Sequence, residues 1–390
     1  MQLDLSSEQE AFRAEVRAFL DEQLTPEMRR GASLTSGVFA EPEVAGPWQD
    51  ALEARGWLTY FWPREHGGTG WGGVQRWIFE TECARAGAPV LPGMGLKLVG
   101  PVIYTFGTDA QREHFLPALR RGEHFWAQGF SEPGSGSDLA SLQTRAVRDG
   151  DDYLVTGQKI WTTQAQFANW LFALVRTDQE VKAQRGISFL LIDMTSPGVT
   201  VRPILSASGD HDLNEVFLDN VRVPTANRVG DEGQGWSIAK FLLENERGGT
   251  GYAPLLLADL ERIERAAALS GSLADRAVRL RLEAEALEMT ELRTRLEIEA
   301  GEPPAPRSLA TKLIASEIRQ GIEELALDAF GLAGLQLPPA RPFHHHADDL
   351  VGPPEAGLAA ARYLNARAWS IFGGTSEIQL NIIARAALGS

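Results

Sequence analysis

The sequence predicts a mainly α-helical protein built from three blocks, a helical one, then a β one, then a second helical one. Apolar residues recur at helical spacing up to residue 123, and long amphipathic stretches return after residue 230. Between them lie short runs of strand formers separated by Gly, Pro, Asn and Asp, a pattern typical of an antiparallel sheet or barrel. We therefore expect three domains, at residues 1–123, 124–230 and 231–390.

The first block opens with a helix-start signal. Ser7 and Glu10 have capping-box spacing, and one helical face after them is apolar, with Phe12, Val16, Phe19 and Leu20. A break is expected at Gly46-Pro47, after which Trp48, Leu52 and Leu58 continue the pattern. Further helices are expected over residues 74–86 and 111–119.

The β block starts with a hairpin signal at Asp149–Asp152, followed by the strand formers Tyr153, Val155 and Ile160. Apolar and β-branched runs bounded by turn residues predict the later strands, and Pro224 ends the last. The expected strands are Trp170–Arg176, Ile187–Asp193, Val199–Ile204, Glu215–Leu218 and Val221–Val223.

The last block reads as an antiparallel helical bundle. A long Ala/Leu/Glu/Arg-rich helix is expected over residues 255–300, then a break at Pro303, Pro304 and Pro306. A helix over residues 308–330 and a helix-rich segment from Ala356 complete the set. Long amphipathic pieces joined by short breaks favour a bundle.

Composition excludes several classes of function. A net charge of −15 and a pI near 5.0 argue against binding the bare backbone of nucleic acid. Cys83 is the only cysteine, so neither an intrachain disulfide nor a cysteine metal cluster is expected. The charged N-terminus lacks the apolar run of a signal peptide, and no run approaches the ~20 apolar residues of a membrane span. We expect a cytoplasmic protein.

The segment Gln128–Asp138 is the richest local signal. Its small residues let backbone N–H groups approach an anion or a flavin edge, and Ser131 and Ser137 add hydroxyl donors. Taken alone, such a loop is more often structural, and it lacks the strand–turn–helix context of a dinucleotide fingerprint. In Lys159–Thr163, Trp161 can cover a planar cofactor, with Thr163 on the same side of a strand.

Together these segments resemble the acyl-CoA dehydrogenase family, at that family's spacing. The matching continues through Asn214–Phe217, Val223-Pro224, Arg362–Arg367, Gly373–Gln379 and Ile382–Arg385. The branch it resembles most is typified by the large subunit of pimeloyl-CoA dehydrogenase and by steroid side-chain acyl-CoA dehydrogenases. The resemblance implies a helical N-terminal domain, an antiparallel β-barrel and a C-terminal four-helix bundle, with FAD at a subunit interface. It also implies dehydrogenation of an acyl-CoA thioester to the trans-2-enoyl-CoA.

The resemblance assigns roles residue by residue. Gly331 belongs to a stretch, Asp328–Gly334, that departs from the family's Gln followed by Gly-Gly-x-Gly. The implied FAD contacts are Gln128, Phe130, Ser131, Gly136, Ser137, Trp161, Thr163, Gly331, Thr375 and Glu377. The implied acyl-CoA contacts are Ser137, Arg247, Gly373 and Gly374.

The catalytic base is the largest departure. Many relatives carry it as the glutamate just before the Gly-Thr pair, where this chain has Gly373. Other branches place the base on an earlier helix, just before an arginine, and the matching residue here is Glu246. Glu244 and Glu246 lie ~200° apart around a helix, so only one can face the substrate. The bland alternative for Glu246 is a solvated helix carboxylate.

The resemblance also suggests partners and competing functions. An electron-transfer flavoprotein is the expected electron acceptor, and a homo- or hetero-oligomer is the expected assembly. A catalytically silent subunit of a two-gene enzyme and an acyl-CoA oxidase remain alternatives. His344–His346 lacks companion ligands at metal-binding spacing, so no metal is expected.

Overall fold

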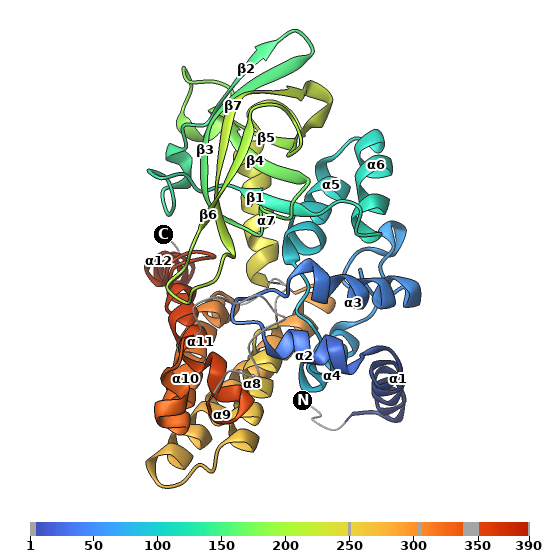
Figure 1. The fold of residues 1–390 in the computed structure, drawn as a ribbon. Helices are drawn as coiled ribbons and strands as arrows, with labels where there is room; N and C mark the ends of the chain where they lie inside the picture. Colours follow the sequence, from blue (N-terminus) through green and yellow to red (C-terminus); the bar gives the residue numbers. More distant parts are fainter. Residues whose placement is uncertain (1–4, 249–250, 303–305, 338–350, 389–390) are drawn as a thin grey trace.

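The three expected blocks are present, arranged as a helical N-terminal domain, a β-sheet middle domain and a helical C-terminal domain (Figure 1). The structure is a computed structural model of the chain. It describes residues 5–248, 251–302, 306–337 and 351–388, with the backbone alone at residues 244–248 and 306–307.

The N-terminal domain is a set of short helices around an aromatic-rich core. Its core side chains include Trp48, Trp57, Trp62, Phe79 and Phe115. The elements are α1 (Ser7–Gln23), α2 (Pro26–Ser33), α3 (Pro42–Arg55), η1 (Arg64–His66), α4 (Gly73–Ala86), η2 (Met94–Val99), α5 (Gly100–Phe106) and α6 (Asp109–Arg120).

Two expectations for this domain were wrong. The capping box lies one residue earlier than expected, because Ser6 Oγ accepts from Gln9 N and Gln9 Oε1 accepts from Ser6 N. The helix α3 also runs through Gly46-Pro47 without a break. A proline there removes one backbone hydrogen bond, and burial of Trp48 and Leu52 on the same helix outweighs that loss.

The middle domain is one eight-stranded sheet in the order β6-β7-β3-β2-β4-β5-β8, with β1 paired to β4. The hairpin expected at Asp149–Asp152 is confirmed, with Asp149 opposite Asp152 and Gly150 at φ 63°. The strands are β1 (Trp126–Gly129), β2 (Arg145–Asp149), β3 (Asp152–Thr163), β4 (Trp170–Arg176), β5 (Ile187–Asp193), β6 (Val199–Ile204), β7 (Leu213–Pro224) and β8 (Arg228–Val229). Short 3-10 turns connect them, namely η3 (Leu139–Ser141), η4 (Ala183–Gly186) and η5 (Thr225–Asn227).

The sheet differs from a closed antiparallel barrel. Its outer strands, β6 and β8, are not paired with each other in the described part of the chain. Pairing is mixed, since both β1 and β2 run parallel to β4. The two short strands expected at residues 215–218 and 221–223 are one strand, β7, which continues through Asn220 at φ 49°.

The C-terminal domain holds the bundle. The helix expected over residues 255–300 is two helices, because the chain breaks at residues 267–271, with Gly271 at φ 53°. The bundle core includes Leu256, Leu260, Ala284 and Ile318. The elements are α7 (Gly235–Gly248), α8 (Ala253–Ala266), α9 (Ser272–Glu299), η6 (Pro306–Ala310), α10 (Thr311–Phe330), η7 (Gly331–Leu335), η8 (Pro354–Leu358), α11 (Ala359–Ala366), η9 (Arg367–Ser370) and α12 (Ser376–Leu388).

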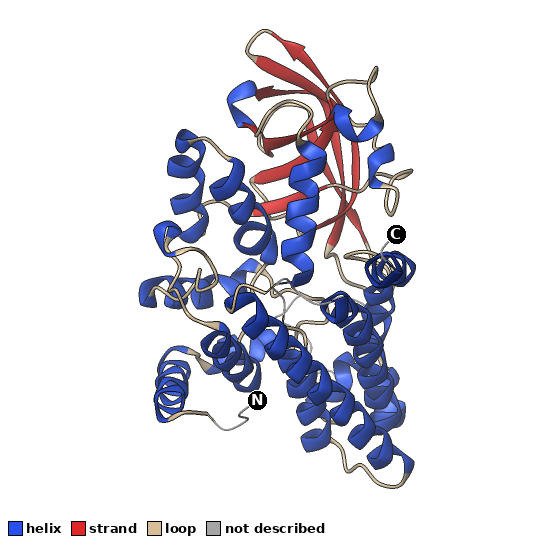
Figure 2. Cartoon of the chain, turned by 180° about the vertical axis from the view of Figure 1, so that it is seen from behind, coloured by secondary structure: helices blue, strands red, loops and turns tan. Residues whose placement is uncertain are grey.

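Helix α7 connects the sheet to the bundle (Figure 2). Its buried residues Ile238, Ala239 and Leu242 join the core of the N-terminal domain and one face of the sheet. Gly235 lets its first turn approach β5 closely, because a Cβ there would lie 2.6 Å from the Ser188 carbonyl carbon. The last turn of α7 therefore points away from the sheet, toward the junction of the domains.

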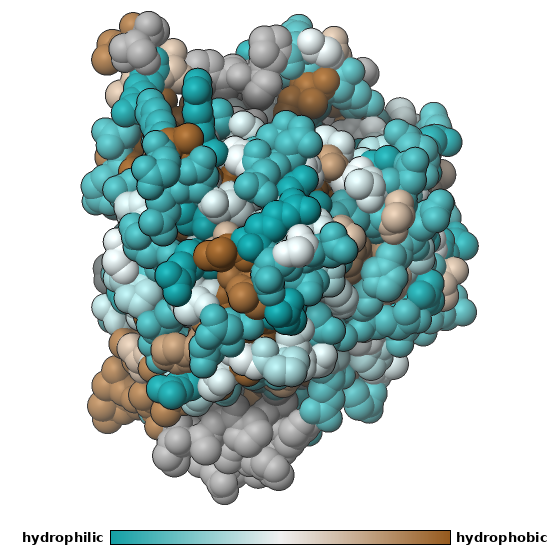
Figure 3. Space-filling model, turned by 90° about the horizontal axis from the view of Figure 1, so that it is seen from above, coloured by the Kyte–Doolittle hydropathy of each residue, from teal (hydrophilic) through white to brown (hydrophobic). Residues whose placement is uncertain are grey.

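The surface above the sheet is mostly hydrophilic, with hydrophobic residues in small patches (Figure 3). Among the described residues, no helix is long and apolar enough to cross a membrane.

Candidate functional site

The two richest sequence motifs meet in space. Ile160 N donates to Ser131 O over 3.0 Å, which joins the end of β3 to the loop that follows β1. Within this loop, Glu132 and Ser135 exchange backbone hydrogen bonds of 2.8 and 2.9 Å. The segment at residues 128–138 is thus a tight turn anchored on the sheet.

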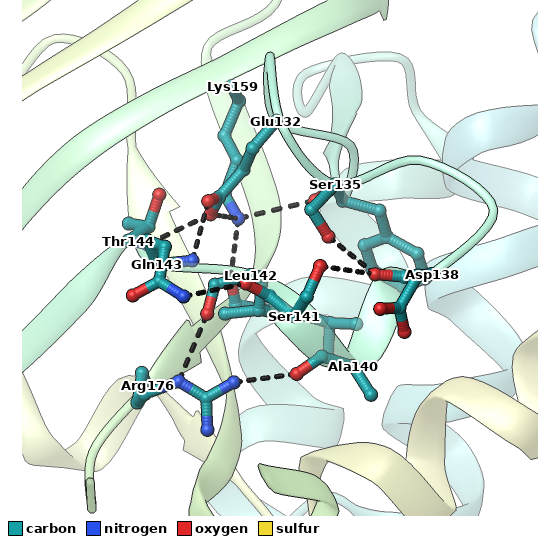
Figure 4. A network of polar contacts seen from close by, with 12 residues as sticks. Glu132, Ser135, Asp138, Ala140, Ser141, Leu142, Gln143, Thr144, Lys159 and Arg176 are labelled. Atoms are coloured by element: carbon teal, nitrogen blue, oxygen red, sulfur yellow. Dashed lines mark hydrogen bonds and ion pairs between the residues drawn. The ribbon is translucent and has the colours of Figure 1, made fainter.

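A buried ion pair fixes this turn (Figure 4). Lys159 is fully buried, and its Nζ donates to Glu132 Oε1 over 2.7 Å and to Leu174 O over 2.7 Å. The Glu132 carboxylate also accepts from the N–H groups of Gln143 and Thr144, at 2.6 and 2.9 Å. Because nearly every polar atom of the pair has a partner, the pair holds three chain segments in one geometry.

The pKa values of the pair reflect burial and mutual attraction. Burial lowers the pKa of Lys159 to about 8, against the opposing effect of the Glu132 charge. Burial acts to raise the pKa of Glu132, but the Lys159 charge and the hydrogen bonds outweigh it, so that pKa is lowered. Both groups are therefore charged at neutral pH.

Arg176 holds the other end of the turn from β4. Its guanidinium donates to Leu142 O over 3.0 Å and to Ala140 O over 2.7 Å (Figure 4). The outer face of the turn is left open: Gly136 and Ser137 are exposed, and a Cβ at Gly136 would meet no atom within 4 Å. Backbone groups there are accessible to a ligand.

Trp161 stands at the end of β3 in a strained conformation. Its φ is +60°, at a register shift between Lys159 and Thr162, and 57% of the residue's surface is exposed. Left-handed backbone is unfavourable for a residue with a Cβ, and such strain gathers at functional sites. Thr162 is buried, whereas Trp161 and Thr163 stay accessible. An indole ring exposed in this way can pack against the face of a planar cofactor.

The C-terminal motif forms a second rigid loop, at the end of the bundle nearest the sheet (Figure 1). Gly373 and Gly374 have φ values of 63° and 91°, which favour glycine. Lys312 Nζ donates to Trp369 O over 2.6 Å and to Gly374 O over 3.0 Å, and Gln379 Nε2 donates to Gly373 O over 3.2 Å. Neither glycine N–H has a hydrogen-bond partner in the described part of the chain.

Thr375 and Glu377 organise the start of α12. Thr375 Oγ1 accepts from Ile378 N over 3.2 Å, as an N-cap does. The exposed Glu377 carboxylate has a lowered pKa because its own backbone N–H and the Thr375 hydroxyl donate to it. No hydrogen bond, ion pair or ring contact joins this loop to Trp161 within the described ranges.

The remaining assigned residues are spread more widely. Gln128 lies in β1 opposite Phe172, and Phe130 is buried against Phe172 and Phe189. Gly331 follows α10, about 30 Å along that helix from Lys312. The contact of Gly331 with FAD stays a prediction.

Glu246 and Arg247 fall on the last turn of α7, where side chains lie outside the described residues. His344–His346 also lie outside the described residues. The backbone places Glu246 at the end of α7 farthest from the sheet, and α7 packs against η2 and α5. Its role as base stays a prediction.

Comparisons with known proteins cover the whole chain. Models of the acyl-CoA dehydrogenase N-terminal, middle and C-terminal domains match residues 6–123, 127–221 and 233–388. The acyl-CoA dehydrogenase IpdE1 of Mycobacterium tuberculosis is 35% identical over an alignment of 389 residues, which covers 97% of this chain and 97% of that protein. The chain belongs to the acyl-CoA dehydrogenase family.

Solved structures of other acyl-CoA dehydrogenases have the same fold. The Tcur3481-Tcur3483 steroid ACAD matches with a TM-score of 0.84 at 28% identity, covering 100% of this chain and 99% of that one. The ChsE4-ChsE5 complex of M. tuberculosis matches with a TM-score of 0.79 at 30% identity, covering 100% and 99%. Members of the family are flavoproteins that oxidise acyl-CoA, and this chain is one of these oxidoreductases.

Sequence reasoning missed the polar groups that hold the site. Lys159 and Glu132 stand within the two motifs, but their 27-residue separation gives no sign that they pair. Lys312 lies in an ordinary helical stretch, 62 residues from Gly374. The positive φ of Trp161 has no sequence signal, because tryptophan is not a turn residue.

Proposed function

We propose that the chain is an FAD-dependent acyl-CoA dehydrogenase that converts an acyl-CoA thioester to the trans-2-enoyl-CoA. The observation that carries the proposal is the exposed, strained Trp161 beside the open turn at residues 131–137. A half-exposed indole next to accessible backbone N–H groups and serine hydroxyls suits the flat ring and polar edge of a flavin. A bound flavin supplies the acceptor for the hydrogen that leaves the β carbon.

The residues assigned to the cofactor divide by position. Ser131, Gly136, Ser137, Trp161 and Thr163 would hold the flavin from the middle domain, with Gln128 and Phe130 shaping the floor of the turn. Thr375 and Glu377 would meet it from α12, and Gly331 would meet the FAD of a neighbouring subunit. FAD is the flavin proposed, because the acyl-CoA dehydrogenase family that the motifs resemble uses FAD.

In this proposal, the loop that contains Gly373 and Gly374 holds the thioester. A proton beside a thioester is weakly acidic, so its removal needs a base and donors for the developing oxyanion. The N–H groups of Gly373 and Gly374, in a loop fixed by Lys312 and Gln379, suit that oxygen. Ser137 and Arg247 would bind the CoA portion.

Glu246 is the base in this proposal. Gly373 carries no side chain, so the proton must pass to another carboxylate, and α7 presents Glu246 at the junction of the domains. Its neighbour Glu244 lies ~200° around the helix and faces elsewhere, which provides a matched control.

An electron-transfer flavoprotein would accept the electrons, and the active form would be an oligomer. The second point is supported by the names of the two solved relatives above, each of which pairs two proteins. A catalytically silent subunit predicts a colourless protein that does not take up FAD, whereas the proposal predicts a yellow one.

The test is anaerobic titration of the yellow protein with a panel of acyl-CoAs. We expect bleaching of the flavin by wild type and by Glu244→Gln, and loss of bleaching in Glu246→Gln with flavin content unchanged. Equal bleaching by Glu246→Gln would remove Glu246 from this role. Hydrogen peroxide formed in step with acyl-CoA consumption in air would instead identify an oxidase.

A further inference from the structure

One lysine stands apart from the ion pairs of the N-terminal domain. Lys97 lies in η2 and makes no hydrogen bond or ion pair with any other residue that the structure describes. It lines a cavity of about 150 Å³ between α3, α4, η2 and the start of α8. Its side chain is exposed to solvent in the free protein, so the ammonium loses its hydration only when a guest fills the cavity and displaces that water.

The walls of this cavity are mostly apolar. Two of its polar side chains pair with each other, since Tyr60 Oη donates to Glu80 Oε1 over 2.7 Å, and Arg295 Nη2 donates to Glu80 Oε2 over 2.6 Å. Burial raises the pKa of the Cys83 thiol strongly, so the thiol is neutral. The apolar lining includes Leu52, Leu58, Phe61, Phe79, Leu91 and Leu255.

Among the residues that line the cavity, Lys97 carries the one positive charge. The cavity leaves its side chain open to solvent, yet the surrounding protein lowers its pKa, because desolvation disfavours the ammonium form. Glu80 faces Lys97 as the nearest opposite charge, and Arg295 shares that carboxylate and opposes a second cation. A ligand oxygen in the cavity would give the Lys97 ammonium the hydrogen-bond acceptor that the described residues do not provide.

The segment that carries Lys97 is unusual. Residues 94–99 form a π-helix, a rare conformation that is often found at functional sites. The Trp62 indole N–H donates to Leu96 O over 2.8 Å, and Gly100 lets that ring approach, because a Cβ there would lie 2.4 Å from it. These contacts fix the direction of the turn on which Lys97 sits.

The cavity also adjoins the helix of the proposed base. The helix α7 packs against η2, and Gly251, five residues after Glu246, lines the cavity. Five residues span at most about 18 Å, so the Cα atoms of Glu246 and Gly251 are no farther apart than that, a distance that a long acyl chain can bridge. A volume of about 150 Å³ accepts a guest the size of one benzene ring.

We infer that this cavity receives the distal end of the acyl group, and that Lys97 selects acyl-CoA substrates carrying a carbonyl or carboxylate oxygen there. The inference rests on the proposed function and adds a substrate class to it. A methyl-ended acyl chain can fill the apolar walls but leaves Lys97 without a partner. An oxygen-bearing chain packs against the apolar walls and also accepts a hydrogen bond from the ammonium.

The test compares three acyl-CoAs of equal length: one methyl-ended, one with a ketone near the end, and one with a terminal carboxylate. For the wild-type protein as purified, we expect kcat/KM for at least one oxygen-bearing substrate to exceed the methyl-ended value by roughly 10- to 100-fold. Lys97→Met should abolish that ratio, because the variant has neither the charge nor a hydrogen-bond donor at that position. Lys97→Gln keeps a donor without the charge, so a ratio retained there assigns the ketone and a ratio lost assigns the carboxylate.

Controls separate the two hypotheses. Lys182→Met removes an exposed lysine of the middle domain and should leave every ratio unchanged. Calorimetry gives Kd for each acyl-CoA. The ratio of these Kd values between oxygen-bearing and methyl-ended substrates tests the role of Lys97 even in a variant without turnover. Failure of all three acyl-CoAs to bleach the flavin would overturn the proposed function alone. An equal preference in wild type and Lys97→Met, by kcat/KM or by Kd, would overturn the role of Lys97.

Discussion

Lys159 Nζ lies 2.7 Å from Glu132 Oε1 in the interior of the middle domain, and through this pair the two cofactor motifs share one support. Breaking a buried pair by removing one partner leaves an uncompensated charge. We expect Lys159→Met to lower the free energy of unfolding by about 3–5 kcal/mol and to reduce flavin content. Urea denaturation and the ratio of flavin to protein absorbance measure both effects.

A matched control is available on the same sheet. Arg222 pairs with Asp149 and Asp152 on the surface, and Arg222→Met should change neither stability nor flavin content measurably. Adding Glu132→Leu to Lys159→Met should not restore stability, because the N–H groups of Gln143 and Thr144 lose their acceptor. Equal losses in Lys159→Met and Arg222→Met would contradict the structural role of the pair.

Trp161 offers a test in which stability and cofactor binding move in opposite directions. Trp161→Gly removes an exposed ring and relieves a left-handed backbone, so the protein without flavin should gain about 1 kcal/mol. Flavin affinity should fall, because the glycine variant has no indole ring to cover the flavin face. Thermal unfolding of the apo-protein and flavin titration are the measurements. Trp126→Ala, at a buried ring, should instead cost about 3–5 kcal/mol.

Lys312 tests the loop assigned to the thioester. Lys312→Met removes the donor to the carbonyls of Trp369 and Gly374, so the loop loosens while the flavin face of the middle domain stays intact. We expect kcat to fall roughly 10- to 100-fold with flavin content unchanged. Stopped-flow reduction by acyl-CoA measures this rate. Lys240→Met, at an exposed lysine on α7, is the control. A stability loss without a change in kcat would leave the loop a structural role only.

The sequence predicted the parts of the fold that depend on local pattern. Strands β4, β5 and β6 have their expected bounds, since turn residues flank each run of strand formers. The capping box was placed one residue too late, because Ser6 and Ser7 are equally good caps. The break within residues 255–300 was missed, although Ser270-Gly271-Ser272 is a turn signal, because the long stretches on both sides are rich in helix formers. Polar partners such as Lys159 and Glu132 depend on tertiary packing, which no local spacing encodes.

The candidate site divides in the same way. Ser131, Ser137, Trp161 and Thr375 were assigned through the family resemblance. The structure places the two serines in the turn after β1, Trp161 exposed at the end of β3, and Thr375 as the cap of α12. Lys97 escaped sequence reasoning because its cavity is assembled from segments that lie far apart in the sequence. In the sequence, Lys97 reads as an ordinary polar residue in an apolar stretch. The cavity beside it exists only in the fold, where α3, α4 and α8 pack around it.

Glu291 should make the stability of the protein depend on pH. Its carboxylate is buried on α9 and accepts from Tyr252 N over 2.9 Å and from Ala253 N over 3.3 Å. Burial raises the pKa of Glu291 from 4.5 to about 7, against those hydrogen bonds and the Arg295 charge. The folded state therefore binds a proton that the unfolded state has released between pH 4.5 and about 7.

The sign of the effect follows from that proton. Its stabilisation is fully present below pH 4.5 and is lost as pH rises to about 7, a fall of about 3 kcal/mol. Glu291→Gln should remove this fall. Burial raises the pKa of Asp212 to about 6 and gives both proteins a dependence of the same sign, so the measured quantity is the difference between them. Urea denaturation of both proteins from pH 4.5 to 8 provides it, and parallel curves would show that Glu291 stays ionised throughout.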